Sequence, residues 1–206
     1  SAYFADGDGG RDNRVERWDA SDGKPTKVEW VSPEGCPEQR HKEEFNNPHS
    51  IAYHEPSDLL LIADRENSRI AVMNPETGLL NDKMNGTLRC DGLGLGPEGK
   101  PFGVRTLTAR DVDLLFVAVA INPQDADNQF FHVVDMTGFS SSGSCKSVLQ
   151  TIPIDPSLCH TPHLMGVDDK RGDVYLACVA EPNSNVLRFA SHTDDLIQRQ
   201  AHDLII

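Results

Sequence analysis

The sequence lacks any apolar run long enough to cross a bilayer. The longest run, between Asp113 and Asn122, falls well short of the ~20 residues that a transmembrane helix needs, so we expect no membrane span. Basic residues are also scarce: 19 Lys and Arg stand against 32 Asp and Glu, which gives a net charge of −13 without a basic cluster. Because nucleic-acid affinity depends on clustered Lys and Arg, we expect no nucleic-acid partner.

Several familiar signatures are missing as well. No C-x-x-C pair occurs, which argues against zinc fingers and thioredoxin-like sites. No Gly-x-Ser-x-Gly elbow, Walker loop or His-Glu-x-x-His motif is present. No helical periodicity extends beyond about ten residues. The chain opens at Ser1 inside a strand pattern, without an initiator Met or a signal core, which is typical of a mature or internal segment.

The cysteines point to an oxidising compartment. Four of the five, Cys36, Cys90, Cys145 and Cys159, lie in Gly-, Pro- or Ser-rich loops, where secreted proteins often carry disulfides. Cys178 lies in an apolar strand pattern and is expected to be a buried thiol. A glycosylation sequon, Asn85-Gly86-Thr87, falls in another loop. We therefore expect a disulfide-bonded glycoprotein of the extracellular space or secretory pathway.

A repeat runs through the chain. Its anchor is a strand that ends in alanine, followed by a polar turn and an amphipathic strand. The anchoring alanines are Ala5, Ala63, Ala118 and Ala177, at spacings of 58, 55 and 59 residues. An earlier strand that opens with proline precedes three of these anchors, at Pro48, Pro101 and Pro162. The first unit lacks this opening strand.

Short strands at even spacing, separated by Gly, Pro, Asn and Asp turns, predict an all-β fold and specifically a β-propeller. We expect one propeller domain over residues 1–206, incomplete, with blades at about 1–45, 46–97, 98–158 and 159–206. About four blades of a six-bladed ring would then be present. The segment 196–206 could form a short helix or the opening strand of another blade.

The stretch from Pro48 to Val72 is the best-preserved unit. Its Pro-His-Ser-Ile-Ala and Ile-Ala-Asp-Arg-Glu-Asn-Ser-Arg-Ile segments resemble the NHL-repeat propeller of the peptidyl-α-hydroxyglycine α-amidating lyases (peptidylamidoglycolate lyases). The likeness extends over nearly the whole chain in weaker form. It implies a six-bladed ring with a central zinc ion held by histidines from three blades. It also implies a peptide substrate, split into a peptide amide and glyoxylate.

Three residues fall on functional positions of that family. His49 and His163 match two zinc ligands, and the third ligand would lie upstream of Ser1. Arg65 matches an arginine that grips the substrate carboxylate and is the candidate catalytic residue. Three imidazoles with an open fourth position are typical of catalytic zinc.

Each of these residues also has a local interpretation. A buried histidine can satisfy both ring nitrogens with nearby backbone, and Arg65 can pair with Asp64 or Glu66. His160 is off the repeat position and is expected in a loop. The acidic turn that contains Asp6, Asp8 and Asp12 does not fit the EF-hand template, so we expect a plain hairpin without calcium.

The pattern departs from the lyases at two points. The turn between Asp6 and Arg14 holds no tyrosine where the family has its base, and Leu164 follows His163 where the family has an aspartate. We therefore predict a non-catalytic extracellular NHL-repeat propeller that binds a protein partner or serves a structural role. The alternative is a metal-dependent lyase that acts on peptidyl-α-hydroxyglycine.

Overall fold

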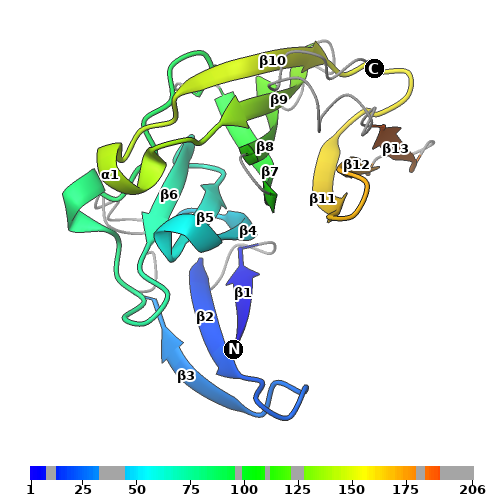
Figure 1. The fold of residues 1–206 in the computed structure, drawn as a ribbon. Coiled ribbons are helices and arrows are strands. Elements are labelled where there is room, and N and C mark those ends of the chain that lie inside the picture. Colours follow the sequence, from blue (N-terminus) through cyan, green and yellow to red (C-terminus); the bar gives the residue numbers. More distant parts are fainter. Residues whose placement is uncertain are drawn as a thin grey trace.

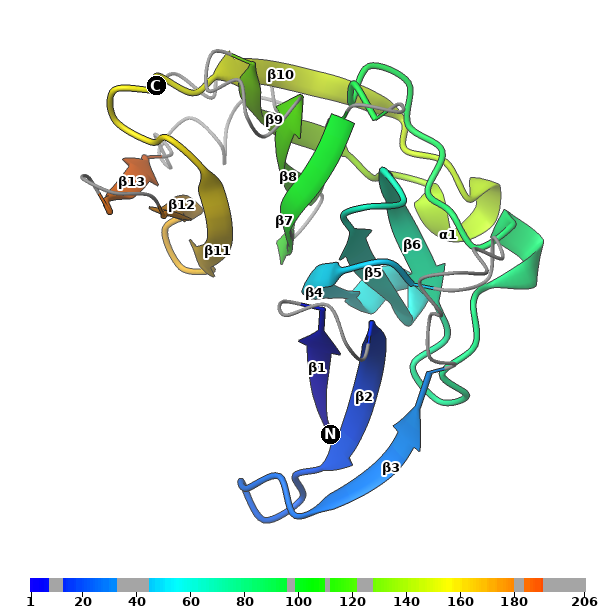
Figure 2. The same cartoon turned by 180° about the vertical axis from the view of Figure 1, so that it is seen from behind.

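The computed structural model describes residues 1–7, 13–32, 45–95, 99–109, 112–121, 128–179 and 184–190. Regular structure in these residues is almost entirely β-strand, arranged in four antiparallel sheets. The sheets follow one another around a common centre, as Figure 1 and the reverse view in Figure 2 show. The expected all-β propeller fold is confirmed. The total of six blades stays a prediction, and segment 196–206 lies outside the described residues.

Every sheet takes its strands in chain order. The first sheet contains β1 (Ala2–Asp6), β2 (Arg14–Asp19) and β3 (Lys27–Val31). The second contains β4 (Pro48–His54), β5 (Leu59–Asp64) and β6 (Arg69–Met73). The third contains β7 (Gly99–Ala109), β8 (Val112–Ile121), β9 (Gln129–Asp135) and β10 (Ser147–Pro153). The fourth contains β11 (Pro162–Asp168), β12 (Asp173–Cys178) and β13 (Val186–Phe189). The short helical turns are η1 (Glu55–Ser57), η2 (Asp82–Met84) and α1 (Phe139–Ser142).

Strand β5 shows why the middle strand of a sheet has a nearly continuous apolar sequence. All six of its residues are buried. Leu59 and Leu61 face the third sheet, whereas Leu60 and Ile62 face the first. Since successive side chains point to opposite faces of a sheet, a blade that is covered on both faces needs apolar residues at every position.

The hydrophobic core consists of three layers, one between each pair of successive sheets. Val15, Phe45 and Ile62 belong to the layer between the first and second sheets. Val72, Val104 and Val117 belong to the layer between the second and third. The layer between the third and fourth sheets includes Phe116, Phe131, Met165 and Leu176. Each sheet is therefore held mainly by its neighbours in the arc.

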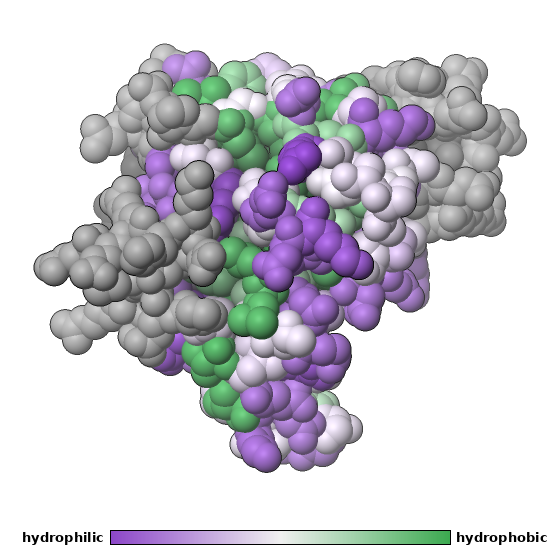
Figure 3. Space-filling model, turned by 90° about the vertical axis from the view of Figure 1, so that its left-hand side faces the viewer, coloured by the Kyte–Doolittle hydropathy of each residue, from purple (hydrophilic) through white to green (hydrophobic). Residues whose placement is uncertain are grey.

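The two end sheets keep exposed apolar side chains. On the first sheet Phe4 is 44% and Val31 43% exposed; on the fourth Leu164 is 45% and Val186 66% exposed. Figure 3 shows apolar and polar side chains mixed on one face of the molecule. Within the described residues, no further sheet covers the outer sides of the arc.

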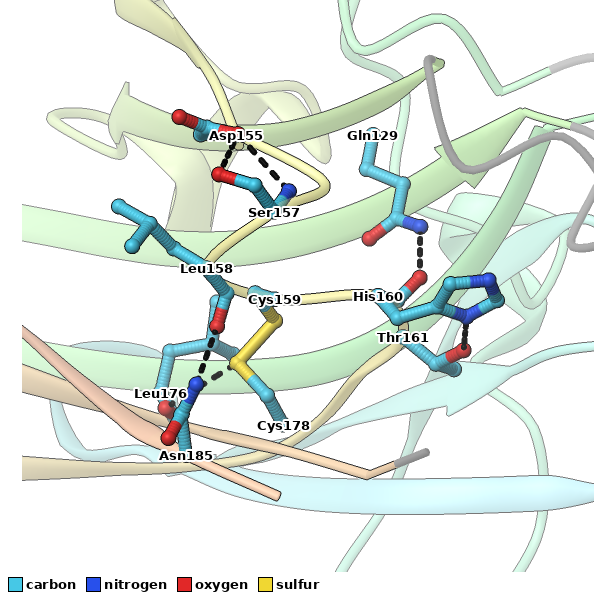
Figure 4. Close-up of a disulfide and its surroundings, with 10 residues drawn as sticks. All are labelled: Gln129, Asp155, Ser157, Leu158, Cys159, His160, Thr161, Leu176, Cys178 and Asn185. Atoms are coloured by element: carbon cyan, nitrogen blue, oxygen red, sulfur yellow. Dashed lines mark hydrogen bonds between the residues drawn. A yellow bond between two sulfur atoms is a disulfide. The ribbon is translucent and has the colours of Figure 1, made fainter. Parts of the chain in front are cut away.

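Two disulfides join loops and strands. Cys90 bonds to Cys145, and Cys159 bonds to Cys178 (Figure 4). The expectation that Cys178 is a free thiol was wrong. Its strand partner in the β11–β12 ladder is Pro162, only three residues after Cys159, so the ladder brings the two sulfurs together. Cys36 lies outside the described residues.

Candidate functional site

The opening strands β4, β7 and β11 lie side by side around the centre of the arc (Figures 1 and 2) and share an irregularity. Each pairs regularly with the next strand of its sheet except at the residue after its first proline. The skipped residues are His49, Phe102 and His163. A β-bulge leaves one residue out of the ladder and re-aims its side chain. The repeat thus presents the same position three times, and we call these three residues the bulge cluster.

The bulge cluster brings the two predicted histidines together. His49 Nε2 lies 3.2 Å from His163 Nε2, although 114 residues separate them in the chain. His49 is buried, and its Nδ1 lies 2.7 Å from the carbonyl oxygen of Phe102. A carbonyl only accepts hydrogen bonds, so Nδ1 carries the proton. In neutral His49 the Nε2 lone pair therefore points at His163.

This geometry suits two ligands of one metal ion. Zinc–nitrogen bonds of 2.0–2.1 Å in a tetrahedral site place two ligand nitrogens roughly 3.3 Å apart. Metal-bound histidines commonly donate the other ring N–H to a backbone carbonyl, as His49 does to Phe102. Within the described ranges, however, no group of three or more His, Cys, Asp or Glu could hold a metal. The pair accordingly fits two positions of a zinc site and leaves the others to groups beyond these residues.

Phe102 is the centre of the cluster. Its ring contacts that of His49 edge-on, with 5.4 Å between centroids. The guanidinium carbon of Arg65 lies over the same ring, 5.1 Å from the centroid of Phe102. The structure thus brings Arg65 to the same place as the two histidines, through a cation–π contact.

Arg65 also pairs with its neighbour in the turn. Its Nε lies 2.9 Å from Glu66 Oε1, and Lys100 Nζ lies 3.3 Å from the other carboxylate oxygen. Burial would raise the pKa of Glu66, but the hydrogen bond from Arg65 and the charge of Lys100 lower it overall. Asp64, the other partner considered for Arg65, is buried and accepts hydrogen bonds from Arg69 at 2.6 Å and Asn67 at 2.8 Å.

The remaining candidates are His160 and the aspartates of the first turn. His160 is an exposed loop residue whose Nδ1 lies 3.3 Å from Thr161 Oγ1. Asp6 pairs with Arg14 at 3.6 Å, whereas Asp8 and Asp12 lie outside the described residues. The absence of calcium there stays a prediction.

Sequence reasoning missed a Ser-His-Asp row between the second and third sheets. His54 Nδ1 lies 2.6 Å from Ser57 Oγ, and its Nε2 lies 2.9 Å from Asp113 Oδ1. The His54 side chain has 0% exposure and packs edge-on against Phe139. The hydrogen bonds of this imidazole therefore join two blades. Nothing in the repeat pattern links His54 with Asp113, 59 residues away.

Comparison with known proteins adds a family signal to this geometry. Residues 45–73 match the family model described as the NHL repeat. This part of the chain is similar to an NHL repeat. This repeat covers β4 to β6, and its bulge carries His49.

Two similar proteins extend the comparison. NHL repeat-containing protein 3 of Homo sapiens is 28% identical over 178 residues, covering 85% of this chain and 43% of that protein. The chain therefore spans less than half the length of this NHL-repeat relative. A solved structure of a protein of unknown function from Bacteroides caccae aligns with a TM-score of 0.47 and 14% identity, over 90% of this chain and 56% of the other. The resemblance to the amidating lyases remains a prediction.

No helix within the described ranges is both long and apolar enough to span a membrane.

Proposed function

We propose that this chain is an extracellular NHL-repeat propeller that binds a protein partner and is itself non-catalytic. The observation that carries this proposal is the packing at the centre. The third bulge position holds Phe102, and Arg65 contacts that ring while pairing with Glu66. An arginine that is already paired is poorly placed to grip a substrate carboxylate. The NHL-repeat relative and the stacked, well-packed sheets favour a rigid binding module instead.

Two measurements test this proposal together. The folded chain, immobilised, is incubated with conditioned culture medium, and any captured protein is purified and titrated back in solution. We expect a saturable binding curve; capture that never saturates would contradict a specific partner. In parallel the chain is incubated with an α-hydroxyglycine-extended peptide and zinc. We expect no glyoxylate above a zinc-only control, and zinc-dependent release of glyoxylate would overturn the non-catalytic assignment.

The extracellular location has its own test at Asn85. This residue is exposed in a left-handed turn (φ 50°) directly after η2, so an oligosaccharide could be attached without disturbing the core. Asn85-Gly86-Thr87 is the sequon of the chain. Expressed in secretory eukaryotic cells, the chain should lose mass on treatment with peptide-N-glycosidase F, and Thr87→Ala should abolish that loss. Secretion of a chain that carries no glycan at Asn85 would contradict the glycoprotein assignment.

A second candidate function is favoured by the histidine pair. We propose that His49 and His163 hold zinc through their Nε2 atoms, with other ligands from outside the described residues. Bound zinc would supply Lewis acidity at the centre of the propeller, which is the property the alternative lyase function requires. The chain's own contribution is to fix both imidazoles, His49 by its hydrogen bond to Phe102 and both by their bulges.

Metal stoichiometry tests this second candidate without an activity assay. The chain is stripped with a chelator, dialysed, and titrated with zinc by calorimetry. His49→Ala and His163→Ala should each weaken zinc binding strongly, whereas His160→Ala, at an exposed histidine nearby in the chain, should not. Equal affinity in all three variants would remove the candidate.

A further inference from the structure

Arg105 lies on β7, the edge strand of the third sheet that packs against β4 and β11, and no carboxylate among the described residues pairs with its charge. Its Nη1 donates hydrogen bonds to Ile51 O at 2.8 Å, Val104 O at 2.7 Å and Ser50 Oγ at 3.1 Å. These acceptors are two carbonyls and a hydroxyl from the second and third blades. None carries a full negative charge.

The other arginines behave differently. Those that pair with a carboxylate within the described residues are Arg14, Arg17, Arg65, Arg69, Arg171 and Arg188. Arg89 is without a carboxylate there, but it is exposed, so water solvates its charge. Arg105 is half-buried, and burial lowers the pKa of its guanidinium. Partial desolvation of an unpaired cation costs free energy, which a bound anion would recover.

One edge of the Arg105 guanidinium remains available. All three hydrogen bonds engage Nη1. The Nε and Nη2 atoms have no hydrogen-bond partner among the described residues, and neither is buried from solvent. These two atoms donate parallel N–H bonds on one side of the guanidinium plane, the arrangement that binds a carboxylate through both oxygens.

The anchor of this guanidinium lies on the strands that line the centre of the arc. Ser50 and Ile51, which anchor Nη1, directly follow His49 in β4. Arg105 itself lies three residues after Phe102 in β7. Nη1 of Arg105 therefore contacts the residues that directly follow His49, and the strands that carry these residues, β4 and β7, lie side by side near the centre of the arc (Figure 2).

We propose that Arg105 binds the carboxylate of a ligand at the centre of the propeller, with Nη1 fixed by the protein and the Nε–Nη2 edge facing the ligand. One guanidinium carries a single positive charge and a planar pair of donors. A carboxylate complements it with a single negative charge and a planar pair of acceptor oxygens. The carboxylate can come from a small organic acid or from the C-terminus of a peptide. This inference goes beyond the proposed partner binding and requires neither bound zinc nor catalysis.

Calorimetric titration of the full chain tests the proposal with three probes: an acetylated tripeptide with a free C-terminus, the same peptide as its C-terminal amide, and acetate. We expect the free acid to bind, and we expect the affinity of the amide to be lower by about tenfold or more, because the amide cannot supply a charged hydrogen-bond acceptor. Acetate that competes as well as the peptide would identify a small organic acid as the ligand class. Free acid and amide that bind alike, or the absence of binding by both acids, would overturn the proposal.

Variants assign the effect to Arg105. Arg105→Gln can still donate to Ile51 O but loses the charge and should weaken binding of the free acid about tenfold or more. Arg105→Lys keeps the charge without the planar fork and should bind at an intermediate level. Arg89→Gln, which removes an exposed and unpaired charge elsewhere, should bind like the original chain. Unchanged binding in folded Arg105→Gln would refute the assignment. If that variant does not fold, the comparison of acid and amide on the original chain still decides.

The double variant His49→Ala, His163→Ala separates this site from the zinc candidate. We expect it to lose zinc binding and keep selectivity for the free acid over the amide. Loss of both would show that the carboxylate binds through a metal ion, which contradicts a direct role for Arg105.

Discussion

The imidazole of His132, on β9, is held in its neutral form by its surroundings. It is 3% exposed, its Nδ1 lies 3.0 Å from Thr151 Oγ1, and its Nε2 is buried without a partner among the described residues. Burial disfavours the imidazolium and lowers the pKa of His132 from 6.5 to about 4. A proton therefore binds the unfolded chain more readily than the folded one between these two values.

This difference predicts a pH dependence of stability. His132 leaves the free energy of unfolding unchanged above its unfolded pKa of 6.5, and it lowers that free energy as the pH falls from there towards about 4. His132→Asn cannot titrate, so we expect its unfolding free energy to fall less between pH 7 and pH 5. Urea unfolding at the two pH values measures both slopes. Identical slopes in the two proteins would contradict the prediction.

The sequence allows the positions of some single residues to be predicted and not the surroundings of others. The convergence of His49 and His163 was predictable, because both follow proline at one position of a repeat and equivalent positions of a propeller face the axis. The environment of Arg105 was not. It depends on how β4 and β7 approach each other, and the sequences of these two strands do not specify which carbonyls a long side chain will meet.

Among the elements, the two disulfides close loops of different length. Cys90 and Cys145 are 55 residues apart, whereas Cys159 and Cys178 are 19 apart. Removal of a link that restricts the unfolded chain costs more for the longer loop, about 4 kcal/mol against about 3 kcal/mol in the chain-entropy estimate. We expect Cys90→Ser with Cys145→Ser to lower the unfolding free energy more than Cys159→Ser with Cys178→Ser. Guanidinium unfolding measures both, and the reverse order would contradict this prediction.

The strand elements also explain the error at Cys178. An apolar strand pattern predicts burial, and Cys178 is indeed 3% exposed. The pattern carries no information about register, however. Only the pairing of Pro162 with Cys178 places Cys159 close enough to form the bond. Element type could be predicted from the sequence, whereas cross-strand partners required the structure.

For the molecule as a whole, the layers between the sheets should dominate stability. Leu176 is fully buried between the third and fourth sheets, whereas Val186 is 66% exposed on the outer side of the fourth. We expect Leu176→Ala to cost about 2–5 kcal/mol of unfolding free energy. Val186→Lys in this chain should stay within about 0.5 kcal/mol. Thermal and urea unfolding compare the two, and a large loss for Val186→Lys would mean that another sheet or chain covers that face.

At this scale the repeat spacing predicted the architecture well. The alanine anchors fall on β1, β5, β8 and β12, one in each of the four sheets. The spacing could not predict the extra strand β10 of the third sheet, because its edge position imposes only a weak apolar pattern. The number of blades in the ring stays a prediction, since the core layers join successive sheets and such layers are alike in rings of different size.

The shared bulge has a consequence for engineering. Since Phe102 stands outside the ladder, its side chain can be exchanged without altering strand register, and the bond that orients His49 uses only its backbone carbonyl. A different side chain at this position would therefore change the chemistry of the bulge cluster and leave the strands in place. Phe102→His should place a third imidazole beside the pair and tighten zinc binding in calorimetry, whereas Phe102→Leu should not. Equal zinc affinity in the two variants would show that the side chain at position 102 does not point towards the histidine pair.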